Sequence, residues 1–325
     1  MFLEFNRWDS AQKLYEAAIT KVMNKEAHDY TLNLVLTTFG DTLKDESISD
    51  DSIRAFALTL PSESALSSSA AVIDPPAIRI ARKQIKQAIA RTYSSDLLSS
   101  YNKLTAAIKS DGETFKVDGV SVGRRRLRNV YLGYLCSIAS TGDEQRNAAS
   151  IATKHFESAT GMTDKLAAFN ILASMSGEGA EARDLAIKNF YEDAKGDSLV
   201  LNKWFAVQGD AHLDDVLERV IKLTSHPDFT LKNPNRARAL ILSFTGNAAA
   251  FHDESGNGYK WLGDILEKMD KINSKVAART TASSLLGWKS YNEKRALLMK
   301  AQLERLRNMP DISNDLLEIV TKGLK

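Results

Sequence analysis

A repeat of paired helical segments that begins near residue 143 constrains the fold more than any other feature. Three pairs follow one another: "NAASIATKHFESAT" with "MTDKLAAFNILASM", "EARDLAIKNFYEDA" with "LVLNKWFAVQG", and "LDDVLERVIKLTSH" with "NPNRARALILSF". Phe156, Phe190 and Leu223 occupy matching places near the ends of the first helices, 34 and 33 residues apart. Two helices that recur with a period in the thirties bury their apolar faces against the next pair. The pattern therefore predicts an α-solenoid, a superhelix of antiparallel helix pairs.

The remaining sequence also favours helices, so we expect an all-α chain. Only 6 prolines interrupt the 325 residues. The segment 124–140, "RRRLRNVYLGYLCSIAS", places its apolar residues on one helical face. Asp74 followed by Pro75 marks a helix start. One segment, "ETFKVDGVSVG", has the character of a hairpin, with Asp118-Gly119 as its turn.

We expect a single superhelical domain over residues 1–325, with a soft internal boundary near 61–76. That stretch, "PSESALSSSAAVIDPP", is rich in serine and separates an N-terminal helical segment from the repeat array. A net charge of +2 and the lack of any run of about 20 apolar residues indicate neither nucleic acid nor membrane as a partner. Cys136 is the only cysteine, and the N-terminus has no secretory pattern. We therefore expect the cytoplasm or another reducing intracellular compartment, and no secretion.

The sequence contains no motif that makes a catalytic centre or a metal site. None of the five histidines has a second histidine within four residues, as the zinc motif H-E-x-x-H requires. The segment "HDES" at His252 reads as a solvated loop, and Cys136 as a buried, inert thiol. We expect no catalytic residue, no metal ligand and no cofactor in this chain.

The densest basic run is "GRRRLRNVY". A solvated or ion-paired helix face explains it best in a chain of nearly balanced charge. Nucleic-acid binding through Arg124 to Arg128 is the alternative, and it would give steeply salt-dependent affinity.

The segment "KNPNRARALILSF" carries two arginines at a predicted helix start, with Asn233 as N-cap and Pro234 at the first position. Arg236 and Arg238 stand about 200° apart around the helix, so they cannot share a face. Salt bridges to a neighbouring repeat are the simpler explanation. The other is a carboxylate or backbone anchor on the concave surface, where solenoids bind partners.

Seven segments, in order, carry a resemblance to a known family: "EFNRWDSAQ", "IDPPAI", "MTDKLAAF", "NKWFAVQ", "HPDFTLKNPNRARALILSF", "AAFHDESGNGYKWLGDIL" and "KVAARTTASSLLGWKSYNEKRALLMKAQLERL". Together they resemble the C-terminal helical domain of zinc aminopeptidases of the aminopeptidase N (alanyl aminopeptidase) type. The resemblance runs from about Glu4 to Leu324, and "NPNR" with "FH-x-x-x-G-x-GY" carries most of its weight.

The resemblance implies a non-catalytic domain that caps the active site and forms the wall of a substrate chamber. In such enzymes the zinc and the catalytic residues lie in preceding domains, which would be partners of this chain together with the peptide substrate. Arg238 and Arg279 match arginines that face the chamber, and Arg236 is a further candidate without an assigned role. Ser290 and Asn292 depart from the family's usual basic and acidic residues, which weakens any surface-charge argument there.

Two functions thus stand beside the nucleic-acid alternative. The leading one is the C-terminal domain of an enzyme that removes N-terminal amino acids from peptides, which is no enzyme as an isolated chain. The alternative is a free-standing helical scaffold that binds peptides or a protein partner on its concave face.

Overall fold

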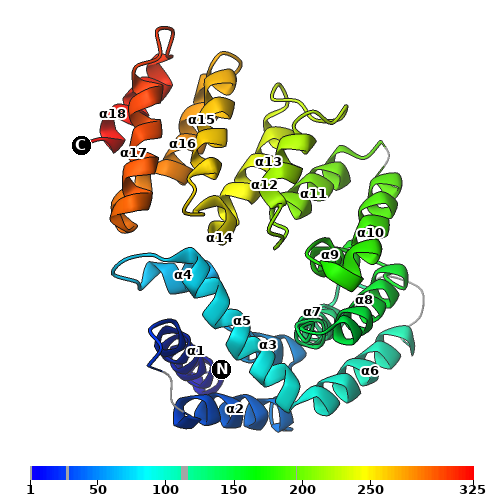
Figure 1. Cartoon of the computed structure of the whole chain (residues 1–325). Helices are drawn as coiled ribbons and strands as arrows, with labels where there is room; N and C mark the ends of the chain where they lie inside the picture. The colour runs from blue at the N-terminus through cyan, green and yellow to red at the C-terminus, as the bar shows by residue number, and fades with distance from the viewer. Residues whose placement is uncertain (1, 27–28, 111–115, 195) are drawn as a thin grey trace. The chain divides into compact units, whose positions relative to one another are not determined.

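The computed structural model describes residues 2–26, 29–110, 116–194 and 196–325, and the regular elements within them are helices joined by loops. These ranges hold 18 α-helices, two short 3-10 helices and, instead of strands, one isolated bridge between Ile73 and Tyr291. The all-α prediction is therefore confirmed (Figure 1).

The chain forms two compact units, which we describe separately. Unit 1 comprises Met1–Leu66 and Ala77–Lys188, and unit 2 comprises Ser67–Pro76 and Asn189–Lys325. The serine-rich stretch 61–76 that we took as a soft boundary contains the whole short segment of unit 2. The single superhelical domain over 1–325 stays a prediction.

Unit 1 contains the helices of the first half of the chain. They are α1 (Phe2–Met23), α2 (Asp29–Lys44), α3 (Asp51–Ala57), α4 (Glu63–Ser68), α5 (Pro75–Thr92), α6 (Ser94–Ser110), α7 (Gly119–Leu135), α8 (Gly142–Glu157), α9 (Met162–Ala173), η1 (Gly177–Gly179) and α10 (Ala180–Asp193). The unit boundaries fall inside α4 and α10 and at the start of α5.

Helix α7 lies at the centre of unit 1, packed against α3, α6 and α9. Tyr134 of α7 is buried and packs edge-on against Phe39, with ring centroids 5.0 Å apart. Its hydroxyl donates to the backbone oxygen of Leu58 at 2.7 Å, so this large aromatic side chain fills the core without an unpaired polar group.

The hairpin prediction was wrong where the structure describes it. Asp118 is the N-cap of α7: its carboxylate accepts the backbone N–H of Ser121 at 2.9 Å, and Gly119 is the first helical residue. An aspartate at this position satisfies a free N–H of the first turn, and this outweighed the turn preference of Asp-Gly. Residues 113–115 of the proposed first strand lie outside the described residues.

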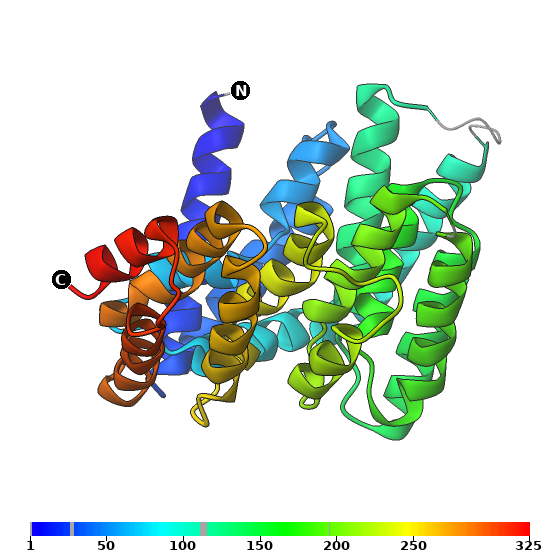
Figure 2. The same ribbon diagram turned by 90° about the horizontal axis from the view of Figure 1, so that it is seen from above.

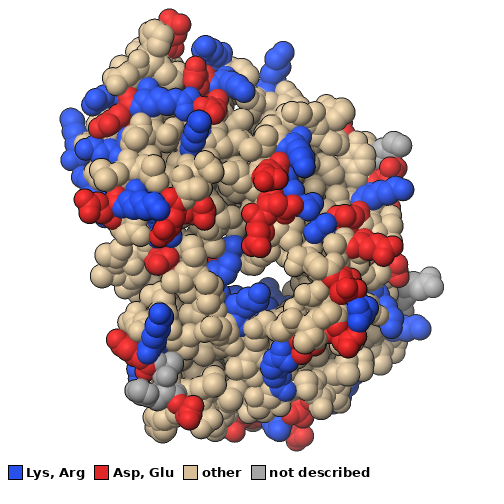
Figure 3. Space-filling view, viewed as in Figure 1, with Lys and Arg blue, Asp and Glu red and all other residues tan. Residues whose placement is uncertain are grey.

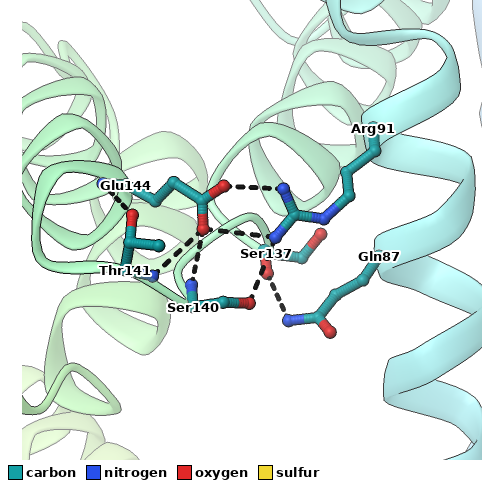
Figure 4. Close-up of polar contacts among 6 residues, drawn as sticks. All are labelled: Gln87, Arg91, Ser137, Ser140, Thr141 and Glu144. Atoms are coloured by element: carbon teal, nitrogen blue, oxygen red, sulfur yellow. Dashed lines mark hydrogen bonds and ion pairs between the residues drawn. The ribbon is translucent and has the colours of Figure 1, made fainter.

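A polar joint between α5 and α8 shows how capping and packing are combined in unit 1 (Figure 4). Thr141 and Glu144 form a reciprocal capping box at the start of α8. Arg91 of α5 reaches the same carboxylate, with Nη1 2.6 Å from Oε1 of Glu144. The hydrogen bond from Arg91, followed by the backbone N–H of Ser140, lowers the pKa of Glu144 to about 2.

Unit 2 contains the second half of the repeat array. Its helices are α11 (Ser198–Gly209), α12 (Val216–Leu223), α13 (Pro234–Gly246), α14 (Ala248–Phe251), α15 (Asn257–Asp270), α16 (Ser274–Leu285), η2 (Leu286–Ser290), α17 (Glu293–Arg307) and α18 (Asn314–Gly323). Figures 1 and 2 show them following chain order, with α15 beside α16 and α17 beside α18. The three repeat positions chosen from the sequence, Phe156, Phe190 and Leu223, are buried.

The pair α11 and α13 packs especially closely because Gly209 has no side chain. A Cβ at Gly209 would stand 2.9 Å from the backbone oxygen of Leu240. Phe244 on α13 continues the core towards α15, with its ring centroid 5.1 Å from that of Trp261. Helix α13 therefore has a fixed place between its neighbours, and its polar residues have fixed directions.

Candidate functional site

Helix α13 begins where the sequence predicts. The side-chain oxygen of Asn233 accepts the backbone N–H groups of Asn235 and Arg236 at 3.0 and 3.2 Å, and Pro234 is the first helical residue. A proline there loses nothing, because its missing N–H would have had no partner within the helix.

Arg236 is an internal residue of unit 2. Its side chain is buried, and Nε donates to Oδ1 of Asn202 on α11 at 2.6 Å. A second guanidinium nitrogen donates to the backbone oxygen of Asp228, and the guanidinium lies over the ring of Phe205, 5.1 Å from its centroid. Burial lowers the pKa of Arg236. Amide and backbone oxygens, rather than a salt-bridging carboxylate, thus hold this arginine between α11 and α13.

Arg238 and Arg279 differ from Arg236 in having no such contacts. Arg238 is half-buried on α13 and Arg279 is exposed on α16. Neither guanidinium makes a hydrogen bond or an ion pair within the described part of the chain. Because α13 and α16 pack against each other, the structure places the two free arginines on neighbouring helices of one unit.

The motif "FH-x-x-x-G-x-GY" builds the turn from α14 into α15. Gly256 has φ +71°, in the left-handed region that favours glycine. A Cβ at Gly258 would stand only 2.6 Å from the backbone oxygen of Phe251. The turn brings Tyr259 back onto His252, and its hydroxyl lies 2.9 Å from Nδ1. These requirements of local geometry explain the spacing of the motif.

His252 is buried at the centre of a polar cluster, so its assignment to a solvated loop was wrong. The hydroxyl of Tyr291 lies 2.9 Å from Nε2, and the two rings stack with centroids 4.2 Å apart. Arg295, which is 2% exposed, donates from Nε to the backbone oxygen of His252 at 2.7 Å. Burial, and then the charge of Arg295, lower the pKa of His252 to about 3.

The same cluster holds the short segment of unit 2. Asp74 forms an ion pair with Arg295, with 3.5 Å between Oδ1 and Nη2. The backbone N–H of Ile73 donates to the backbone oxygen of Ser290 at 2.8 Å. Some contacts in this cluster join residues far apart in sequence, and Asp74 and Arg295 are about 220 residues apart. The F-H-x-x-x-G-x-GY motif is the one sequence pattern that indicates the cluster. Its contacts are those of a structural joint.

Most arginines of the basic run of α7 contact other residues of unit 1. Arg125 donates to the backbone oxygen of Lys116, and Arg126 lies over the ring of Phe56 at 4.5 Å. Arg128 forms a buried ion pair with Asp164, 2.7 Å between Nη2 and Oδ2. On the face shown in Figure 3, basic and acidic side chains are interspersed rather than gathered into one basic patch. These contacts favour the ion-paired helix face over the nucleic-acid alternative.

Cys136 is a buried thiol, as the sequence predicts, and burial raises its pKa to about 12. Within residues 2–26, 29–110, 116–194 and 196–325, no three His, Cys, Asp or Glu side chains are grouped to hold a metal ion. In the same ranges no helix is both long enough and apolar enough to cross a membrane.

The fold places the chain in the class of all-α helical-repeat proteins. Its described residues contain no group of side chains arranged to bind a metal ion. The chain belongs to the DUF3458_C family, described as a domain of unknown function with ARM repeats, whose model matches residues 4–325. The predicted resemblance is confirmed by individual proteins too. The chain is 36% identical over 321 residues to "Aminopeptidase N" of Caulobacter vibrioides and 34% identical over 325 residues to "Aminopeptidase N" of Escherichia coli.

These relatives are much longer than the chain. The matches cover 98% and 99% of the chain, but only 36% of each relative. A solved structure, Legionella pneumophila aminopeptidase A in complex with aspartic acid, is similar with a TM-score of 0.84 and 30% identity, over 99% of this chain and 37% of that one. The chain thus corresponds to the C-terminal helical part of aminopeptidase N.

Proposed function

We propose that the chain is the non-catalytic C-terminal domain of a zinc aminopeptidase, in which it caps the active site and forms the wall of the substrate chamber. Arg238 and Arg279 bind the backbone or the carboxylate end of the peptide from this wall. The zinc and the residues that hydrolyse the peptide bond belong to the preceding domains, which are the partners of this chain. Arg236 has no part in binding, because its guanidinium is occupied by Asn202 and Asp228.

One observation carries the proposal: the contrast among the arginines of unit 2. Arg236 and Arg295 are buried and hydrogen-bonded to other residues of unit 2, whereas Arg238 and Arg279 have no protein partner in the described residues. A guanidinium matches a carboxylate with two parallel hydrogen bonds, and such charge-assisted contacts contribute about 1.5–3 kcal/mol each. Two free guanidiniums on packed helices are therefore suited to a peptide that carries a terminal carboxylate.

The test uses the complete aminopeptidase that contains this domain. We expect Arg238→Ala and Arg279→Ala to lower kcat/KM roughly 10- to 100-fold for short peptides with a free carboxylate, as the contact energy implies. Aminoacyl-arylamides, which lack a peptide backbone beyond the scissile bond, should change less than about 2-fold. The same peptides with an amidated C-terminus separate a carboxylate contact from a backbone contact.

Arg307→Ala is the matched control, because Arg307 is exposed at the end of α17 in the same unit. It should leave both substrate classes unchanged. An equal loss on peptides and arylamides in the Arg238 and Arg279 variants would remove their binding role. Zinc-dependent turnover of arylamides by the isolated chain would overturn the assignment as a non-catalytic domain.

A further inference from the structure

Three helices of unit 2 that pack in a row contain no acidic residue. They are α11, α13 and α16, the second helices of successive helix pairs, with α11 against α13 and α13 against α16. Their basic residues are Lys203, Arg236, Arg238, Lys275 and Arg279. The helices α12, α15, α17 and α18 of the same unit each contain at least one Asp or Glu. The charged side chains of the acid-free row, as we call α11, α13 and α16, are therefore all cations.

The acidic residues of the helices beside α16 are bound by other groups. Helices α15 and α18 both pack against α16. Their acidic residues and the partners of these are Asp264 and Glu267 with Arg305, Asp270 with Ser313, Asp315 with Ser274, and Glu318 with Lys322. Lys275 and Arg279 are exposed, and neither makes an ion pair or a hydrogen bond within the part of the chain that the structure describes. Four residues apart, they lie on one side of α16 with their charges unpaired.

The stability of α16 does not explain a cation at Lys275. This residue lies in the first turn, where the partial positive charge of the helix N-terminus disfavours a cation. Arg279 follows four residues later, and like charges at this spacing destabilise a helix further. The first turn of α16 contains no acidic residue, and Asp315 at the same end binds the hydroxyl of Ser274 instead. A ligand with negative charge would offset both costs.

We propose that the acid-free row selects peptides with acidic side chains, and that Lys275 is a specificity-determining residue beside Arg279. That the ligand is a peptide rests on the proposed function, in which Arg238 and Arg279 hold the backbone or the carboxylate end of the substrate. Lys275 adds a cation one turn from Arg279, so that a glutamate or aspartate of the bound peptide meets two unpaired positive charges. Cations gathered without acidic neighbours raise the local concentration of an anionic ligand and speed its association.

The test compares two peptides in the complete aminopeptidase that contains this domain. Both have an amidated C-terminus, and they differ only in a run of three glutamates or three glutamines after the second residue. We expect kcat/KM to be at least about 5-fold higher for the glutamate peptide at about 10 mM ionic strength, where the screening length is about 30 Å. This ratio should fall below about 2 at about 1 M salt, where the screening length is about 3 Å.

Lys275→Glu and Lys260→Glu form a matched pair, because each changes the net charge by the same amount. Lys260 is exposed on α15, outside the acid-free row. At low salt we expect Lys275→Glu to lower the glutamate-to-glutamine ratio at least about 3-fold, and Lys260→Glu to change it by less than about 1.5-fold. Turnover of an aminoacyl-arylamide should stay within about 2-fold of the parent in both variants, which shows that they are folded.

The proposal is overturned if the glutamate peptide has no advantage in the parent enzyme at low salt. It is equally overturned if the two variants lower the ratio by the same factor, because net charge rather than the acid-free row would then be responsible. A failure of the proposed function looks different: Arg238→Ala and Arg279→Ala would then lose as much on arylamides as on peptides with a free carboxylate. The glutamate and glutamine peptides are amidated, so their ratio does not depend on a contact with a terminal carboxylate.

Discussion

His252 makes the stability of unit 2 depend on pH in a way that can be measured. The imidazole is buried, with Tyr259 on one nitrogen and Tyr291 on the other, and Arg295 beside it. Its pKa of about 3 in the folded chain lies well below the ordinary value of 6.5. A proton therefore binds the unfolded chain first, and acid favours unfolding.

The sign and the window follow from these two values. The stabilisation is fully present above pH 6.5 and is lost progressively as the pH falls towards about 3. Proton linkage then gives a loss of about 2 kcal/mol between pH 8 and pH 5 from this one group. No reduction for solvent screening is needed, because only 5% of His252 is exposed.

Urea unfolding at pH 8 and pH 5, followed by tryptophan fluorescence, measures this loss. Trp204, Trp261 and Trp288 report on unit 2, which contains three of the four tryptophans. His252→Gln has no titratable group at this position, so its loss between the two pH values should be about 2 kcal/mol smaller than that of the parent chain. Carboxylates and other groups that titrate in both proteins cancel in this difference.

Tyr291→Phe is the control that removes a hydrogen bond of His252 but keeps the titratable imidazole. It removes the hydroxyl at Nε2 but keeps the aromatic ring over His252, so the acid-dependent loss should remain. If His252→Gln loses as much stability as the parent chain between pH 8 and pH 5, the buried histidine is not the group that titrates, and the reasoning fails.

Three further predictions concern stability, each measured by urea unfolding at pH 7.5. Arg128→Met should cost about 3–5 kcal/mol because it leaves the buried carboxylate of Asp164 without its guanidinium partner and with His155 nearby, and Arg128→Met with Asp164→Leu should recover most of that loss. Asn233→Ala should lower the unfolding free energy by about 1 kcal/mol through loss of the cap on α13, and Asn233→Asp should not. Arg236→Ala should cost about 2–4 kcal/mol, whereas Arg238→Ala should cost less than about 0.5 kcal/mol.

The features that the sequence predicted correctly depend on neighbours in the chain. Asn233 and Pro234 start α13 because a cap needs only the first turn that follows it. The repeat positions Phe156, Phe190 and Leu223 are buried because helical periodicity places them on an apolar face.

The missed features are contacts between residues far apart in sequence. His252 read as a surface residue because its partner Tyr291 lies 39 residues later, and no local pattern joins the two. Arg128 stood in a basic run, and its buried partner Asp164 lies 36 residues further on. The partners of a buried polar residue depend on which helices pack together. A single sequence indicates that packing only through the periodicity of its apolar residues.

Helix α13 shows how two arginines of one segment acquire different roles. Arg236 lies in the first turn, where the helix dipole disfavours a cation by about 0.3–1 kcal/mol. The oxygens of Asn202 and Asp228 and the ring of Phe205 offset that cost, so its position has a structural explanation. Arg238 lies two residues further on, beyond the first turn, where the dipole has less effect, and no contact within the described residues uses its guanidinium. Fold stability therefore accounts for Arg236 but not for Arg238, whose role in peptide binding stays a proposal.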